Sequence, residues 1–164
     1  MLTFRKMRAD DYNNVDALMQ DLHALHVASR PDMYVPMEHP YSREEFERRV
    51  TGENWICLLA ESAGDVLGIC FVELRSRTCM VDATSAYMHD IYVVPAERRG
   101  KIATMMYRMA EREARERGAL RFDLMVWSFN EDAMGFYRRM GFAPQRYILE
   151  KNITVENFER DCEK

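Results

Sequence analysis

The sequence predicts a single mixed α/β domain that spans residues 1–164. Apolar runs rich in β-branched and aromatic residues alternate with segments whose apolar residues recur at helical spacing. Their order is strand, helix, helix, three strands, helix, strand, helix, strand, and no repeat or low-complexity tract interrupts it. A chain of 164 residues with 48% hydrophobic and 30% charged residues is long enough and apolar enough for one soluble domain with a real core.

The N-terminal segment predicts a strand followed by a helix. The strand is expected at residues 3–7, and Asp10 or Asp11 can cap a helix that runs to about Ser29. The spacing of its apolar residues places them on one face, which is expected to be buried. These residues are Val15, Leu18, Met19, Leu22 and Leu25.

Two histidines on this helix leave three interpretations open. His23 and His26 lie along one edge with Met19 and Arg30. They could bind a metal, but no other cluster of ligand residues completes a set, so a half-buried structural pair is the favoured interpretation. The third interpretation is that this edge lines a pocket for a substrate.

Prolines interrupt the helical pattern at residues 31–41, so this segment is expected to be irregular. Its aromatic content is unusual for a plain linker, and loops of this kind often carry binding residues. A second helix follows, because Ser42 and Glu45 fit a capping box, and it is expected to end near Gly52.

The rest of the chain alternates between strand and helix signals. Apolar runs joined by a Gly-Asp turn predict an antiparallel hairpin, and proline or glycine ends several elements. The expected elements are strands at 55–61 and 66–75, a strand at 87–94, a helix from Ile102 to Gly118, a strand at 120–127, a helix capped by Asn130 and closed by Gly141, and a strand at 146–153.

Composition excludes several classes of function. A net charge of −4 argues against a general nucleic-acid binder. The chain has neither an apolar run long enough to cross a bilayer nor the core of a signal peptide, so a cytoplasmic protein is expected. Cys57, Cys70, Cys79 and Cys162 show no metal-site spacing, and the first two are expected to be buried thiols.

A basic turn between a strand and a helix predicts an anion site. Arg98, Arg99, Gly100 and Lys101 follow the strand at 87–94 and precede the helix that starts at Ile102. A helix start presents N–H groups that have no intrahelical partner and carries partial positive charge. Such a turn suits a phosphate or pyrophosphate, although the same residues are also compatible with an ordinary surface loop.

Two motifs resemble the signatures of the GNAT superfamily of N-acetyltransferases. Arg98-x-x-Lys101-x-Ala103 lies on the first signature, Arg/Gln-x-x-Gly-x-Gly/Ala, with Lys101 in place of the central glycine and Gly100 one position earlier. The string from Asn130 to Phe142, Asn-x-x-Ala-x-x-Phe-Tyr followed by Arg-x-Met-Gly-Phe, resembles the second. The two occur in the family's order with one strand between them.

The resemblance implies the GNAT fold, a mixed and mostly antiparallel sheet in which one parallel strand pair splays apart, flanked by helices. It also implies acetyl-CoA as co-substrate, held in the opening between the splayed strands. The backbone at Ile91, Tyr92 and Val93 would contact the pantetheine arm and the thioester. The residues implied to hold the pyrophosphate and neighbouring groups are Arg98, Arg99, Gly100, Lys101, Ile102, Ala103, Thr104 and Asn130.

The resemblance also suggests catalytic residues. Tyr137 matches the family tyrosine that can protonate the leaving thiolate, and a phenol suits that role because it keeps its proton at neutral pH. His89 lies where several relatives have an acid, and strand alternation predicts that it shares a face with Ile91 and Val93. An imidazole there could accept the amine proton, or it could simply pack; Asp90 would face the other way unless a bulge intervenes.

Three functions are therefore considered. The first is transfer of an acetyl group from acetyl-CoA to a primary amine of a small molecule or peptide. The second is a catalytically inactive acyl-CoA sensor, and the third is binding of another phosphate ligand. Tyr137 and the two signatures favour the first, and the absence of a Gly-x-x-x-x-Gly-Lys-Ser/Thr loop disfavours the third. The expected partners are the amine acceptor and, in a homodimer, a second copy of the chain, with neither nucleic acid nor membrane.

Overall fold

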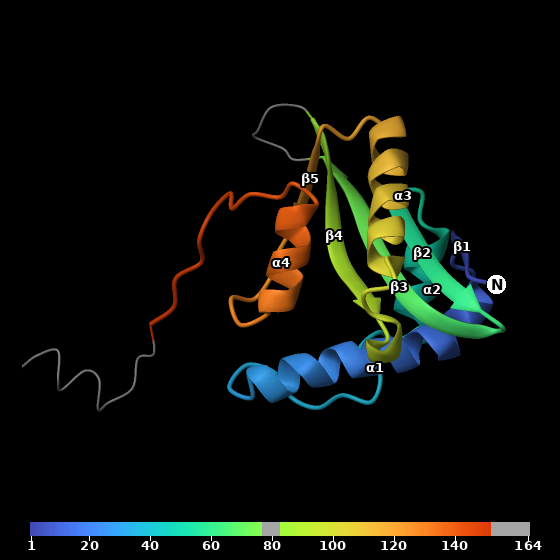
Figure 1. The fold of residues 1–164 in the computed structure, drawn as a ribbon, viewed down its shortest axis with the longest axis horizontal. Coiled ribbons are helices and arrows are strands. Elements are labelled where there is room, and N and C mark those ends of the chain that lie inside the picture. The colour runs from blue at the N-terminus through green and yellow to red at the C-terminus, as the bar shows by residue number, and fades with distance from the viewer. Residues whose placement is uncertain (77–82, 152–164) are drawn as a thin grey trace, which may run out of the picture. The chain divides into compact units, whose positions relative to one another are not determined.

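The computed structural model describes residues 1–76 and 83–151, and residues 1–129 form a compact unit built on a five-stranded sheet (Figure 1). The strand order is β1-β2-β3-β4-β5, and every neighbouring pair is antiparallel except β4 and β5, which are parallel. The predicted mixed sheet is thereby confirmed. The strands are β1 (Thr3–Lys6), β2 (Trp55–Ser62), β3 (Asp65–Ser76), β4 (Thr84–Val93) and β5 (Arg121–Leu124).

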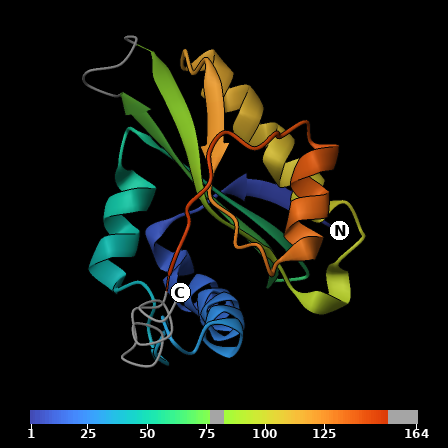
Figure 2. The same cartoon turned by 90° about the vertical axis from the view of Figure 1, so that its left-hand side faces the viewer.

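Helices cover both faces of this sheet, with α1 and α2 on one side and α3 on the other (Figure 2). The helices are α1 (Tyr12–Ser29), α2 (Arg43–Thr51) and α3 (Ile102–Glu116), and short 3-10 turns occur at Ala9–Asp11 and Pro95–Glu97. None of the helices in residues 1–76 and 83–151 combines the length and the hydropathy of a membrane span.

The two faces have separate apolar cores. Gly68 of β3 lets α3 approach closely, because a Cβ there would lie 2.9 Å from the terminal methyl of Met106 and 3.1 Å from the carbonyl oxygen of Tyr92.

Cys57 and Cys70 are buried thiols, as predicted, whereas Cys79 and Cys162 lie outside the described residues. The core under α1 and α2 includes Val15, Leu18, Met19, Phe46, Leu59, Ile69, Phe71 and Tyr92.

Most predicted elements of this unit are confirmed. The β2–β3 hairpin turns through Ala63 and Gly64, both left-handed with φ of 53° and 93°, as a two-residue turn requires. The Ser42 hydroxyl accepts from the Glu45 amide at 3.1 Å and caps α2. The strand predicted at 120–127 is too long, because β5 leaves β4 after Leu124 and the apolar pattern beyond it has no neighbour with which to pair.

The second compact unit begins at Asn130 and contains α4 (Glu131–Arg139). The Asn130 side-chain oxygen accepts from the Ala133 amide at 3.2 Å, and Gly141 follows the helix with a φ of 90°, so both predicted boundaries are confirmed. The strand predicted at 146–153 is not formed at residues 146–151, where an alternating pattern finds no ladder partner; residues 152 and 153 lie outside the described residues.

A bulge interrupts β4 at His89. In the β3–β4 ladder Phe71 lies opposite Asp90 and Val72 lies opposite Met88, so His89 is an extra residue. His89 shares a face with Tyr87 by regular alternation, and the bulge brings Asp90 to that same face, towards α1 and α2. The prediction that His89 shares a face with Ile91 and Val93 is therefore wrong, since it assumed an uninterrupted alternation.

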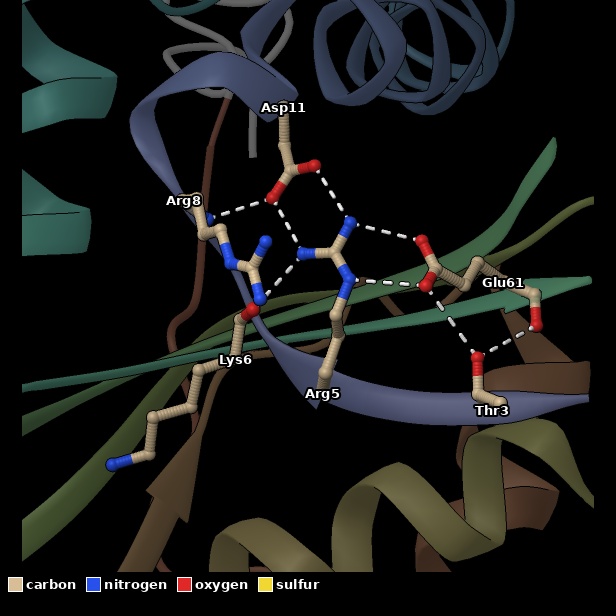
Figure 3. Close-up of polar contacts among 6 residues, drawn as sticks. All are labelled: Thr3, Arg5, Lys6, Arg8, Asp11 and Glu61. Atoms are coloured by element: carbon tan, nitrogen blue, oxygen red, sulfur yellow. Dashed lines mark hydrogen bonds and ion pairs between the residues drawn. The ribbon is translucent and has the colours of Figure 1, made fainter. Parts of the chain in front are cut away.

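An ion-pair cluster centred on Arg5 joins β1, the 3-10 turn Ala9–Asp11 and β2 (Figure 3). The Arg5 guanidinium donates to both oxygens of Asp11 at 2.8 Å and to the two oxygens of Glu61 at 3.0 and 2.9 Å. Asp11 occupies the N-cap position of α1 but caps it with no side-chain bond, because its carboxylate instead accepts from Arg5 and from the Arg8 amide. The Arg5 hydrogen bonds are the main reason that the pKa of Asp11 lies below its ordinary value.

Replacing Arg5 with glutamine is expected to lower the free energy of unfolding by about 1–2 kcal/mol, less than for a fully buried pair because the Arg5 side chain is 27% exposed. The depressed pKa of Asp11 means that its contribution is present above about pH 4 and is lost as the pH falls through its folded pKa. Urea unfolding between about pH 6 and pH 2 should therefore show a shallower pH dependence in the variant than in wild type.

Lys6→Gln serves as the control on the same strand. Lys6 pairs with Glu113 at 2.7 Å but is 64% exposed, so its loss should cost at most about 0.5 kcal/mol. Equal losses for the two variants, or an unchanged pH dependence in Arg5→Gln, would contradict the role assigned to the cluster.

Candidate functional site

The turn between β4 and α3 adopts a strained conformation. Arg99 and Lys101 both have left-handed backbones, with φ of 71° and 67°, whereas Gly100 between them does not have a positive φ. A left-handed conformation costs a residue with a Cβ about 1–2 kcal/mol, and such strain clusters at ligand sites. Lys101 is the residue that stands in place of the signature glycine, so the sequence departure falls at a position whose backbone favours glycine.

The strained turn leaves a set of amides available to a ligand. In the described part of the chain, the first hydrogen bond of α3 runs from the Met105 amide to the Lys101 carbonyl at 2.9 Å, and the amides of Ile102, Ala103 and Thr104 have no backbone acceptor. Alternating backbone conformations ahead of a helix aim successive N–H groups into a concavity that suits an anion. Ile102 is buried, so only its backbone could contact a ligand.

Three cationic residues belong to the same turn as these amides. Among the described residues, neither Arg99 nor Lys101 forms an ion pair, whereas the Arg98 Nε donates to the Val93 carbonyl at 3.1 Å. Arg98 therefore ties the turn to the end of β4. The turn therefore combines free amides, positive charge and a fixed backbone, which are features that an anion site needs, and the binding of an anion there stays a prediction.

Within the described residues, the end of β4 that leads to this turn has a paired strand on one side only. The pairing of β4 with β5 covers only the segment from Ser85 to Met88, and β5 ends at Leu124. Beyond that point Ile91–93 pairs with β3 alone within the described residues. Tyr92 and Val93 have buried side chains, so these three residues could contact a ligand chiefly through backbone N–H and C=O groups.

His89 lies in an aromatic and charged environment at the bulge. Its ring packs on Trp55 of β2 at a centroid distance of 4.9 Å and on Tyr87 at 5.0 Å. Its Nε2 lies 2.9 Å from Glu73 Oε2 and 3.0 Å from an Arg75 nitrogen. Burial lowers the pKa of His89 below its ordinary value, and the hydrogen bond with Glu73 opposes that effect. The ring is therefore neutral near pH 7.

Asp90 has a different partner on the same face. The Tyr41 hydroxyl donates to Asp90 Oδ2 at 2.5 Å, and burial raises the pKa of Asp90 in spite of that bond. The Arg49 guanidinium stacks between the rings of Tyr41, at 3.8 Å, and Trp55, at 4.7 Å. Asp90 is thus engaged by the loop that precedes α2.

The histidines of α1 have structural contacts. His23 Nε2 lies 2.8 Å from the Val35 carbonyl oxygen, and the rings of His23 and His26 pack on Tyr34 at centroid distances of 6.0 and 5.2 Å. The Trp127 indole donates to the Tyr34 hydroxyl at 3.0 Å. These contacts hold the irregular segment against α1, which agrees with the structural interpretation.

Tyr137 lies in α4, in the second compact unit, where its ring packs on Phe136 at 5.4 Å and on Phe142 at 5.6 Å. Asn130 begins the same helix and uses its side-chain oxygen as the cap. The catalytic role of Tyr137 and the cofactor role of Asn130 stay predictions.

The structure gathers His89, the open edge and the anion turn along β4, and it adds partners that sequence reasoning missed. These are Glu73, Arg75 and Trp55. A signal for Glu73 and Arg75 exists in the sequence, because charged residues interrupt an otherwise apolar strand pattern. Nothing local indicates that they meet His89, since that contact depends on the register in which β3 pairs with β4.

Replacing Lys101 with glycine is expected to raise the free energy of unfolding by about 0.5–1 kcal/mol, because glycine adopts the left-handed backbone without the Cβ clash. Lys101→Ala removes the same charge but keeps a Cβ, so it should bring no gain. Urea unfolding of both variants measures the difference. A gain of the same size in Lys101→Ala would attribute the effect to charge rather than to backbone strain.

Comparisons with known proteins identify the family and the fold. Residues 19–142 match the model of the acetyltransferase (GNAT) family. A search of curated proteins found no match. Among solved structures, a mutant protein from Bacillus halodurans superposes with a TM-score of 0.88 at 22% identity, covering 93% of this chain and 99% of its own.

Two further structures have acetyltransferase names. An aminoglycoside acetyltransferase from an uncultured soil metagenomic sample has a TM-score of 0.67 at 20% identity, with 94% and 99% of the two chains covered. An aminoglycoside antibiotic 6'-N-acetyltransferase from Acinetobacter haemolyticus has a TM-score of 0.69 at 18% identity, with 93% and 99% covered. At these identities the likeness concerns the fold. The match over residues 19–142 establishes that the chain belongs to the acetyltransferase (GNAT) family.

Proposed function

We propose that the protein transfers an acetyl group from acetyl-CoA to a primary amine of a small molecule or peptide. The observation that carries the proposal is the left-handed turn before α3, whose unpaired amides adjoin the open edge of β4. Membership of the acetyltransferase family supports acetyl transfer in general. Two neighbours named as aminoglycoside acetyltransferases favour an amine acceptor.

Two places in the chain would suit acetyl-CoA. The amides of Ile102–104, with Arg99 and Lys101, would hold the pyrophosphate through N–H groups and positive charge. The backbone edge of residues 91–93 that faces away from β3 would hold the extended pantetheine arm. Acetyl-CoA supplies the acetyl group as a thioester, which is already activated for attack by an amine.

The acceptor must lose a proton before its nitrogen lone pair can attack, and His89 is the proposed base. Its neutral ring is held at the bulge by Trp55, and its side chain remains 22% exposed, so a substrate proton can reach it. Asp90 is a weaker candidate because its Oδ2 already accepts from Tyr41.

The leaving sulfur must gain a proton, and Tyr137 is proposed to donate it. The proposal rests on the position of Tyr137 in the second signature and on the chemistry of a phenol, which remains protonated at neutral pH. Carboxylates of Glu73 and Asp90 lie near His89 and would favour a cationic amine over an anionic acceptor.

The proposal is tested by incubating the protein with acetyl-CoA and a panel of amines and N-terminal peptides, with thiol release and product mass as readouts. Gly100→Pro removes an amide and locks the turn, so it should abolish the rise in melting temperature that coenzyme A produces. Tyr137→Phe should retain that rise while its turnover falls by about ten- to a thousandfold.

Gly100→Ala is the matched control for the turn, because it keeps the amide, and it should still bind coenzyme A. Pantetheine, which lacks the pyrophosphate, should raise the melting temperature far less than coenzyme A does. Equal stabilisation by the two ligands would contradict the proposed pyrophosphate site. Thiol release without an acetylated amine would contradict the proposed reaction.

A further inference from the structure

Glu73 of β3 is placed to act on His89, and this role deepens the proposed function. The two residues are brought together by the register of the sheet, in which Glu73 lies opposite Tyr87 and His89 follows Tyr87 at the two-residue spacing of one strand face. Trp55 lies opposite Glu73 on the other neighbouring strand and stacks on the His89 ring at an interplanar angle of 33°. Three strands therefore fix this ring in one place.

The contacts of the ring bear on which nitrogen holds the proton. A carboxylate only accepts hydrogen bonds, so the 2.9 Å contact between Glu73 Oε2 and His89 Nε2 favours a proton on Nε2, whereas the Arg75 nitrogen 3.0 Å from the same atom is a donor and favours the other tautomer. With the proton on Nε2, the neutral ring has an unprotonated Nδ1. Within the described residues Nδ1 has no hydrogen-bond partner, which leaves its lone pair available to a substrate proton.

Arg75 keeps Glu73 ionised and in position. Its Nε donates to the same Glu73 Oε2 at 2.7 Å, and the Glu73 side chain is only 22% exposed. Burial alone would raise the pKa of Glu73, but the hydrogen bonds from His89 and Arg75 outweigh that effect and lower it. A charged acceptor is thus present across the neutral pH range.

We propose that Glu73 is the positioning residue for the acetyl-transfer base: it holds His89 with its proton on Nε2, so that Nδ1 accepts the proton of the acceptor amine. In this step the Nδ1 lone pair forms a new N–H bond, and the electrons of the broken N–H bond remain on the amine nitrogen as its attacking lone pair. The imidazolium that results donates through Nε2 to the Glu73 carboxylate, which stabilises its positive charge.

Several charged groups around His89 determine how readily its ring is protonated. Arg75 on β3 and Arg49 on α2 oppose protonation of the ring, whereas Glu73 and the neighbouring Asp90 favour it. Tyr87 packs on the ring, and Tyr41 binds Asp90. Replacing Glu73 and replacing Arg75 should therefore shift the pKa of His89 in opposite directions, which makes the two substitutions a matched pair.

The test is an NMR titration of the His89 ring, identified among the four histidines by its absence in His89→Gln. In wild type, the 15N shifts should show a protonated Nε2 and an unprotonated Nδ1. Glu73→Gln should lower the pKa of His89 by about one unit, the low end of the effect of a nearby opposite charge. Arg75→Gln should raise it. An unchanged pKa in Glu73→Gln, or a proton on Nδ1 in wild type, would overturn the proposal.

The same variants are then assayed for acetyl transfer. The acidic limb of kcat/KM should move to lower pH in Glu73→Gln by the shift measured for the ring, while the KM for acetyl-CoA stays unchanged. A ring pKa that moves while the limb does not, in an enzyme that acetylates amines, would reject Glu73 as a positioning residue and leave the proposed function intact. If no amine is acetylated by wild type, the proposed function fails and the proposal that rests on it is withdrawn.

Discussion

The bulge in β4 is the constraint on which the site depends. One extra residue between Met88 and Asp90 turns His89 and Asp90 to the same face, towards α1 and α2. With regular alternation from Tyr87, His89 would keep its face, but Asp90 would instead point towards α3, away from Tyr41. The same strand continues through Ile91–93 to the strained turn, so one strand positions both the proposed base and the anion site.

The two halves of the proposed site are stabilised by different physical means. The turn before α3 depends on the backbone: left-handed residues, free amides and the bond from Arg98 to the end of β4. The proposed base depends on side chains from three strands, with an aromatic ring against the imidazole and a carboxylate on its Nε2. Under the proposed function, the first half would bind a phosphate group and the second would accept a proton.

The sequence could predict the elements but not every contact between them. Capping residues, the hairpin turn and helical spacing located the helices and most strands because these signals act over a few residues. The bulge, the end of β5 at Leu124 and the cluster around Arg5 depend on strand register and on partners far along the chain. The two family signatures drew attention to the turn before α3 and to Tyr137, whose roles stay predictions, whereas no sequence motif indicates Glu73.

The central claim is that His89 takes the proton of the acceptor, and the pH dependence of kcat/KM with two acceptors of different basicity tests it most directly. Because burial lowers the pKa of His89, the acidic limb should lie below about pH 6.5 for both acceptors in wild type. That limb should disappear in His89→Gln, whose side chain cannot take a proton. A limb that moves with the basicity of the acceptor and is the same in both proteins would contradict the account.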